Sequence, residues 1–141
     1  EGKLKSFAGD YPEKLSINLT FNDALARKIY AGSDLLLMPS LFEPCGLAQM
    51  ISIRYGTLPL VRETGGLKDS ITPFNEFTGE GNGFSFTNYN AHDFLNTIWY
   101  ALKIYYEEPE NWKKIMNNGL KRDYTWTNSA KEYLELYKEL A

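Results

Sequence analysis

The chain is poor in the residues that support disulfide bonds, metal clusters and membrane crossing. It contains one cysteine and one histidine in 141 residues, which excludes an internal disulfide and argues against a metal site built from soft ligands. No apolar stretch reaches the ~20 residues that a membrane-spanning helix needs, and the first residues lack the pattern of a signal peptide. We therefore expect no metal, no membrane partner and a reducing compartment.

An excess of basic residues is also missing. The chain has 15 Lys and Arg against 18 Asp and Glu, a net charge of −3, whereas bulk nucleic-acid binding usually needs a basic face. Its hydrophobic content of 43% and charged content of 23% are ordinary for a globular protein. The composition argues against a nucleic-acid partner, and the length predicts a single domain over residues 1–141.

Short apolar runs alternate along the chain with stretches of helical periodicity. Strands are predicted at residues 15–19, 35–38, 58–61 and 84–86, the second of them fully buried. Helices are predicted from a cap at residue 22 or 23 to Gly32, over 47–55, from a cap at Asn90 through Tyr105, from Pro109 to Gly119, and from residue 127 or 128 onward. Strands that alternate with helices favour parallel pairing with right-handed crossovers. We expect an α/β fold with a Rossmann-like parallel sheet flanked by helices.

Residues 42–47, Phe-Glu-Pro-Cys-Gly-Leu, form the most informative segment, here called the Glu43 loop. It follows an apolar strand and precedes a helix, and ligands of open α/β sheets bind at the carboxyl ends of the strands. Gly46 allows the backbone to approach a ligand closely. The first N–H groups of the helix can meet an anion or hydroxyl oxygens. The alternative is that Glu43 only caps the helix.

Residues 64–66, Thr-Gly-Gly, form a second segment of this kind, here called the Thr64 loop. It follows the next predicted strand, so the two loops are expected at one edge of the sheet, where a single ligand can span both. Its glycines would let backbone amides approach phosphate, although the segment could also be a simple strand-to-helix turn. Arg62 either adds positive potential near a diphosphate or is a solvated strand end.

The ordered set of matching runs within residues 29–67 resembles the donor-binding half of a glycogen or starch synthase of the bacterial and plant type. The runs are residues 29–34, 38–40, 42–47, 54–62 and 64–67, and weaker resemblance continues through residues 82–84 and 126–130. The resemblance implies the two-domain glycosyltransferase B fold, with this chain as its C-terminal half. It also implies ADP-glucose as the donor substrate and ADP as a ligand.

The resemblance also implies roles for individual residues. Glu43 would contact the transferred glucose and support the charge that develops at its anomeric carbon, since glycosyl transfer passes through an oxocarbenium-like state. The backbone amides of Cys45, Gly46 and Leu47 would hold sugar hydroxyls. Cys45 itself is expected to pack or to make backbone contacts rather than to act as a nucleophile.

Further roles concern the phosphates and the base. Thr64, Gly65 and Gly66 would lie near the phosphates or the sugar. Phe21 would stack on the nucleoside base, although it could instead be a hydrophobic staple before the first predicted helix. Ile51 stands where related transferases often carry a second glutamate, which fits the glycogen and starch synthase branch.

The whole enzyme implied by the resemblance moves glucose to the 4-hydroxyl of an α-1,4-glucan, with retention and without an obligatory metal or cofactor. Its acceptor site lies in an N-terminal domain, and its basic diphosphate-binding pair precedes residue 1. We therefore expect this chain to be a fragment that is inactive alone, from a cytoplasmic enzyme or, in a plant, a plastid one. The alternatives are a non-catalytic nucleotide- or glucan-binding module and a signalling receiver domain, whose acidic cluster and strand-end lysine are not evident.

The chain is rich in aromatic residues, at 15%, and most of them are expected in the core. We place Trp99, Trp112 and Trp126 there rather than on a sugar-binding platform. The aromatic face of the last helix has a second explanation, because the last helix of the glycosyltransferase B fold packs on the partner domain.

Overall fold

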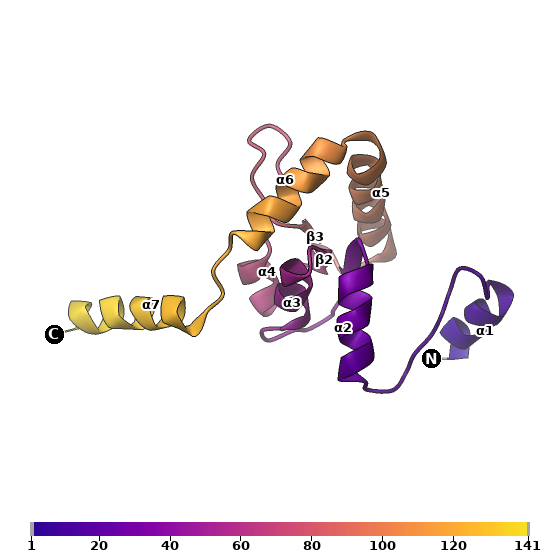
Figure 1. Cartoon of the computed structure of the whole chain (residues 1–141), viewed down its shortest axis with the longest axis horizontal. Coiled ribbons are helices and arrows are strands. Elements are labelled where there is room, and N and C mark those ends of the chain that lie inside the picture. Colours follow the sequence, from indigo (N-terminus) through magenta and orange to yellow (C-terminus); the bar gives the residue numbers. More distant parts are fainter. Residues whose placement is uncertain (1, 141) are drawn as a thin grey trace.

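The computed structural model describes residues 2–140, in which a parallel sheet lies between two sets of helices (Figure 1). The sheet consists of β1 (Leu35–Met38), β2 (Leu58–Arg62) and β3 (Phe84–Phe86). The helices are α1 (Gly2–Asp10), α2 (Asp23–Gly32), α3 (Ala48–Arg54), α4 (Gly65–Ser70), α5 (Ala91–Glu107), α6 (Pro109–Leu120) and α7 (Trp126–Glu139). The expected α/β architecture is confirmed.

The central strand β2 is buried on both faces, as a parallel sheet requires. It pairs in parallel with β1 on one side and β3 on the other, with Leu35 opposite Leu58 and Leu60 opposite Phe84. Alternate side chains of a strand point to opposite faces. Leu58 and Leu60 accordingly join the core cluster under α5 and α6, whereas Val61 joins the cluster under α3 and α4.

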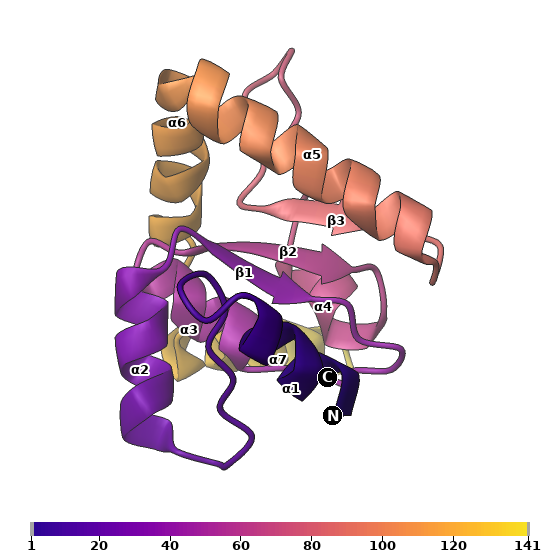
Figure 2. The same ribbon diagram turned by 90° about the vertical axis from the view of Figure 1, so that its right-hand side faces the viewer.

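The helices leave one edge of the sheet to loops. Helices α3 and α4 cover one face and α5 covers the other, while α6 packs on α3 and α5 near the amino ends of the strands (Figure 2). The carboxyl ends of the strands therefore meet only the loops that follow them. This is the edge at which the sequence predicts a site.

Local signals fix several helix ends as predicted. The Asn22 side chain accepts a hydrogen bond from Leu25 N at 3.0 Å and caps α2, and the Asn90 side chain caps α5 by accepting from Asp93 N at 2.8 Å. The buried hydroxyl of Thr57 lies between the carbonyl oxygens of Tyr30 and Ser33. Its single proton can serve one of them at a time, and the contact ties the end of α2 to the start of β2.

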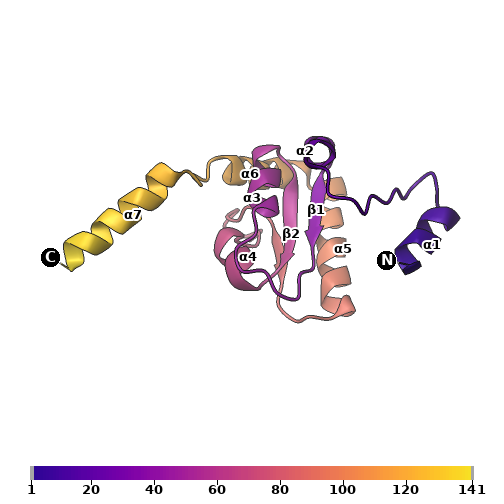
Figure 3. The ribbon, with the colours of Figure 1, turned by 90° about the horizontal axis from the view of Figure 1, so that it is seen from below.

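Two strand predictions need correction. Residues 15–19 are irregular and form no strand, because a strand needs a paired neighbour and this segment runs away from the sheet toward α1 (Figure 3). The strand at 35–38 forms but is not fully buried. In the described sheet β1 is an edge strand, and Leu37 is 44% exposed.

The placement of tryptophans was predicted correctly at one position. Trp112 is buried in the core and stacks near Phe84, with ring centroids 6.0 Å apart. Trp99 and Trp126 are exposed, contrary to the prediction. Trp99 belongs to α5, and Trp126 begins α7, which projects from the body of the domain (Figures 1 and 3).

The terminal helices stand away from the sheet on opposite sides (Figure 3). Helix α7 has no buried residue, and its exposed large apolar side chains are Trp126, Tyr133, Leu134, Leu136 and Tyr137. That this face packs on a partner domain stays a prediction. Within the described residues, no helix combines the length and apolar character needed to cross a membrane.

Candidate functional site

The Glu43 loop and the Thr64 loop lie side by side at the carboxyl edge of the sheet. Because β1 and β2 are parallel and in register, with Met38 opposite Val61, the segments that follow them leave the sheet at the same edge. The Gly66 amide donates a hydrogen bond of 3.1 Å to the carbonyl oxygen of Pro44. The structure thus brings together the two segments that the sequence singles out.

The glycines of the Thr64 loop are needed for this contact. A Cβ atom on Gly65 would lie 2.1 Å from the carbonyl oxygen of Glu43, and one on Gly66 would lie 2.5 Å from the Cα atom of Cys45. Gly65 also has a φ of +46°, a conformation that side-chain-bearing residues rarely adopt. The space beside both glycines is therefore filled by the backbone of the Glu43 loop. Sequence reasoning instead attributed the glycines to the close approach of a ligand.

Gln49, on the first turn of α3, holds the two loops together, and sequence reasoning assigned it no role. Its side chain is fully buried, and its Nε2 atom lies 3.1 Å from Cys45 O, 3.0 Å from Gly46 O and 3.1 Å from Ser70 Oγ. The Ser70 hydroxyl donates in turn to Gly66 O at 2.6 Å. One amide thus connects the carbonyl groups of the Glu43 loop to α4 and the Thr64 loop.

The Glu43 side chain is available for a ligand. It is partly buried, and no hydrogen bond or ion pair within residues 2–140 uses its carboxylate. Cys45 is an exposed free thiol, and Leu47 is exposed at the start of α3, which has no side-chain cap. The first N–H groups of α3 are thereby left for a ligand.

The guanidinium of Arg62 turns toward the segment before the Glu43 loop. Its Nη1 atom donates to Leu41 O at 2.7 Å and Ser40 O at 3.3 Å, and its Cζ atom lies 5.4 Å from the centre of the Tyr89 ring. Arg62 is therefore not the solvated strand end that the sequence offered as one alternative. Its contribution to a diphosphate site stays a prediction, and its visible contacts position the chain that leads to Glu43.

Phe21 lies at an open hollow between α2 and α3. The residue is 99% exposed, so it does not act as a hydrophobic staple in this structure. The hollow has a volume of about 400 Å³ and is also lined by Ile29, Leu47 and Ile51. Because Leu47 belongs to both the hollow and the Glu43 loop, a ligand that stacks on Phe21 could extend to that loop without a gap.

The turn between β3 and α5 is fixed by hydrogen bonds beside this edge. Asn88 Nδ2 donates to Asp93 Oδ2 at 2.9 Å, and this bond, followed by the contact with Asn90, holds the pKa of the Asp93 carboxyl below its ordinary value. Behind the loops, burial raises the pKa of Tyr124, whose hydroxyl lies 3.1 Å from Asn82 Nδ2. No group of three His, Cys, Asp or Glu residues among residues 2–140 is arranged to hold a metal ion.

Comparison with known proteins gives consistent matches. Residues 4–119 match the family of glycosyl transferases group 1. The glycogen synthase of Clostridium acetobutylicum is 58% identical over 137 residues, which are 97% of this chain and 29% of that protein. The glycogen synthase of Desulforamulus reducens is 53% identical over 140 residues, 99% of this chain and again 29% of the relative. The chain thus spans less than a third of the curated relatives it matches.

Solved structures agree with the sequence matches. The catalytic domain of starch synthase IV from Arabidopsis thaliana, bound to ADP and acarbose, superposes with a TM-score of 0.81 at 36% identity over 96% of this chain and 29% of that one. Sucrose-phosphate synthase from Thermosynechococcus elongatus matches with a TM-score of 0.70 at 19% identity, over 99% of this chain and 34% of that one. The second likeness shows the fold alone.

Proposed function

Because the chain belongs to the glycosyl transferases group 1 family, we propose that it is the donor-binding domain of a glycogen or starch synthase that uses ADP-glucose. The observation that carries the proposal is the direct contact of the Glu43 loop and the Thr64 loop at the carboxyl edge of the sheet, with the Glu43 carboxylate free. Relatives more than 50% identical are named glycogen synthase, and the starch synthase IV structure holds ADP.

The donor would lie across α3 from the Phe21 hollow to the two loops. The base would stack on the exposed ring of Phe21, since an aromatic face binds a base without needing a specific hydrogen bond. The glucose and phosphates would meet the amides of Cys45, Gly46 and Leu47 and the Thr64 loop. The continuity of the hollow with the Glu43 loop through Leu47 supports this path.

Glu43 would act on charge that appears only during transfer. When the bond between the anomeric carbon and the phosphate breaks, positive charge develops on the sugar ring, and a carboxylate held nearby stabilises it. A partly buried carboxylate without a protein partner is suited to this role, because it need not break an existing bond to meet the sugar. Glu43 should therefore affect turnover more than donor affinity.

The remaining parts of the enzyme belong to the proposal as well. An N-terminal domain would bring the α-1,4-glucan, and neither a metal nor another cofactor would be required. Residues 1–141 would act as one domain and transfer no glucose alone, because transfer needs donor and acceptor held together. The enzyme would be cytoplasmic, or plastidic in a plant.

The test uses the complete protein with ADP-glucose, UDP-glucose and a maltooligosaccharide acceptor. We expect transfer from ADP-glucose, and α-1,4-linked product with retained configuration by NMR. Transfer from UDP-glucose alone would overturn the donor assignment. Binding of ADP or glucan by calorimetry without transfer from either donor would favour the non-catalytic module.

A further inference from the structure

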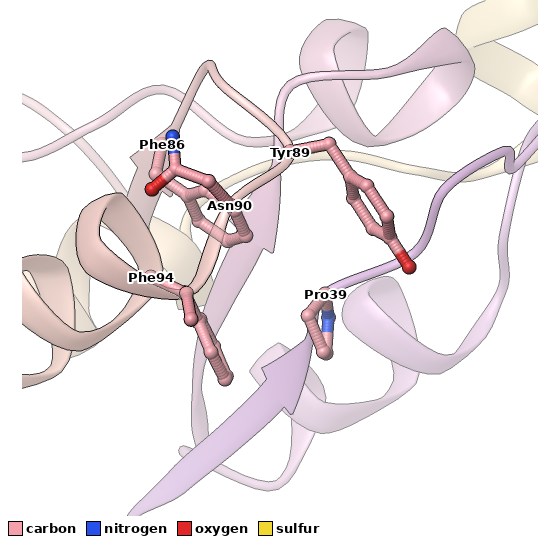
Figure 4. Close-up of a pocket in the computed structure, with 6 residues that line it drawn as sticks. Pro39, Phe86, Tyr89, Asn90 and Phe94 are labelled. Atoms are coloured by element: carbon pink, nitrogen blue, oxygen red, sulfur yellow. The ribbon is translucent and has the colours of Figure 1, made fainter.

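A second hollow lies at the carboxyl edge of the sheet, on the face covered by α5. It has a volume of about 340 Å³ and is lined by Pro39, Phe86, Tyr89, Asn90, Ala91 and Phe94. Figure 4 shows the Tyr89 ring above Pro39, with its hydroxyl directed toward the chain that follows β1, and Phe94 on the other side of the hollow. None of these residues belongs to the donor site proposed above.

The lining of the hollow favours a neutral ligand with both apolar and hydroxyl surface. No lining residue carries a charge, so phosphate or a metal ion would gain little there. Tyr89 and Phe94 offer aromatic surface. The Tyr89 hydroxyl takes part in no hydrogen bond to another group within residues 2–140, while the Asn90 side chain caps α5 through its Oδ1 atom. A pyranose ring fits this chemistry, because its C–H face packs on an aromatic ring while its hydroxyls meet amide and phenol groups.

The position of the hollow connects it with the reacting centre. Arg62 contacts the Tyr89 ring, with 5.4 Å between Cζ and the ring centre, and donates to Leu41 O at 2.7 Å. Leu41 lies two residues before Glu43 in the chain. A sugar stacked on Tyr89 would therefore be connected to the segment that carries Glu43 through the Arg62 side chain. The Phe21 hollow lies instead between α2 and α3 and shares no lining residue with this one.

We propose that this hollow is an acceptor subsite that binds a glucose unit of the α-glucan, with Tyr89 as its stacking residue. This inference rests on the proposed function, because it names where the acceptor of that reaction meets the chain. The donor base is a poorer occupant, since the Phe21 hollow already continues into the Glu43 loop. A phosphate is also a poorer occupant, because no lining residue is charged and the nearby Arg62 guanidinium already donates to Leu41 O and Ser40 O.

Kinetics of the complete enzyme test the subsite, because loss of an acceptor contact should raise the KM for the glucan and leave the KM for ADP-glucose nearly unchanged. Tyr89→Ala should raise the KM for maltoheptaose about tenfold, as expected for the loss of a stacked ring, while the KM for ADP-glucose stays within about twofold. Tyr89→Phe keeps the ring and loses only the phenol contact, so its KM for maltoheptaose should lie between those of the parent and Tyr89→Ala. The matched control is Tyr106→Ala, which removes an exposed tyrosine at the far end of α5 and should change neither value.

An unchanged maltoheptaose KM in Tyr89→Ala would overturn the subsite. So would an equal rise of both KM values, which would mean that Tyr89 serves only to support Arg62 and the Glu43 loop. A Tyr89→Phe variant as weak as Tyr89→Ala would overturn the stacking role.

Glucan binding separates this proposal from the proposed function. If the complete parent protein transfers no glucose, the proposed function fails, but gel electrophoresis through amylopectin still measures its glucan affinity. Tyr89→Ala should then be retarded less than the parent and the Tyr106→Ala control. Equal retardation of all three proteins would overturn the subsite independently of catalysis.

Discussion

The two ends of the proposed donor site are built differently. At the paired loops, backbone meets backbone, glycines stand where any side chain would collide, and a buried glutamine connects both segments. At the Phe21 hollow, one ring is almost fully exposed and lines an open depression. The sugar end is therefore held in place by protein contacts in the absence of a ligand, whereas the base end is an exposed aromatic ring with few protein contacts of its own. Changes to the loop glycines or to Gln49 should therefore disturb folding and function together, and changes at Phe21 should disturb binding alone.

The largest expected effect comes from separating the loops. Gly66→Val would place a branched side chain against the backbone of Cys45, and we expect a loss of about 2–4 kcal/mol in the free energy of unfolding, as for overpacked sites. Urea denaturation of the chain measures it. Gly32→Val is the control, because a Cβ on Gly32 meets no atom within 4 Å. Equal stability of the two variants would show that the loops do not depend on each other.

Glu43→Ala should come next, and it separates catalysis from folding at the same loop. In the complete enzyme we expect kcat to fall about 100-fold or more, as for loss of a group that stabilises transition-state charge. The KM for ADP-glucose and the melting temperature should change little, because no described contact uses the carboxylate. A kcat within about threefold of the parent would contradict a catalytic role for Glu43. A capping role is already contradicted, because α3 begins after Leu47 and has no side-chain cap.

Gln49→Met tests the connection between the loops without changing side-chain volume much. The carbonyl groups of Cys45 and Gly46 would lose a buried donor, and we expect a loss of about 1–3 kcal/mol. Urea denaturation again gives the value. Ser70→Ala should also lower the free energy of unfolding. The double variant should lose less than the sum of the two single variants, because both side chains belong to one hydrogen-bond chain. Full additivity of the two changes would contradict the connection.

Phe21→Ala should have the smallest effect on the fold. We expect ADP to bind about 1–2 kcal/mol more weakly to the complete enzyme, the value of one base stacked on one ring, with an unchanged melting temperature. Phe21→Tyr keeps the ring face and should bind ADP as the parent does. Calorimetry with ADP tests the stacking role. Parental ADP affinity in a folded Phe21→Ala protein would remove Phe21 from the base site.

The sequence was sufficient for features that depend on neighbouring residues. Short apolar segments located β1, β2 and β3, although only residues 35–38 form a continuous apolar run of purely aliphatic side chains. Asn22 and Asn90 located two helix starts, because a cap bonds to an amide three residues away. The strand predicted at 15–19 failed because alternation alone does not supply a partner strand. Trp99 and Trp126 were misplaced for a related reason, since burial depends on whether another element covers that face.

The candidate site was predictable in outline but not in its internal contacts. The order strand, loop, helix placed the Glu43 loop and the Thr64 loop at one edge, because parallel strands share their carboxyl ends. Their direct contact depends on the distance between α3 and α4, which no local pattern encodes. The one available signal for Gln49 was its position among the inward-facing residues of α3, beside Ser52 and Ile53. A polar residue at such a position usually has a buried partner.

The exposed position of β1 has a consequence for the behaviour of the chain on its own. Within the described sheet one side of this strand is unpaired, and its sequence Leu-Leu-Leu-Met carries no charged residue that would discourage a second strand from pairing there. Pro39 follows directly and limits such pairing to the four residues. At high concentration we therefore expect two copies of the isolated chain to self-associate along this edge. Leu37→Lys, at a side chain that is already exposed, should keep the chain monomeric in size-exclusion chromatography.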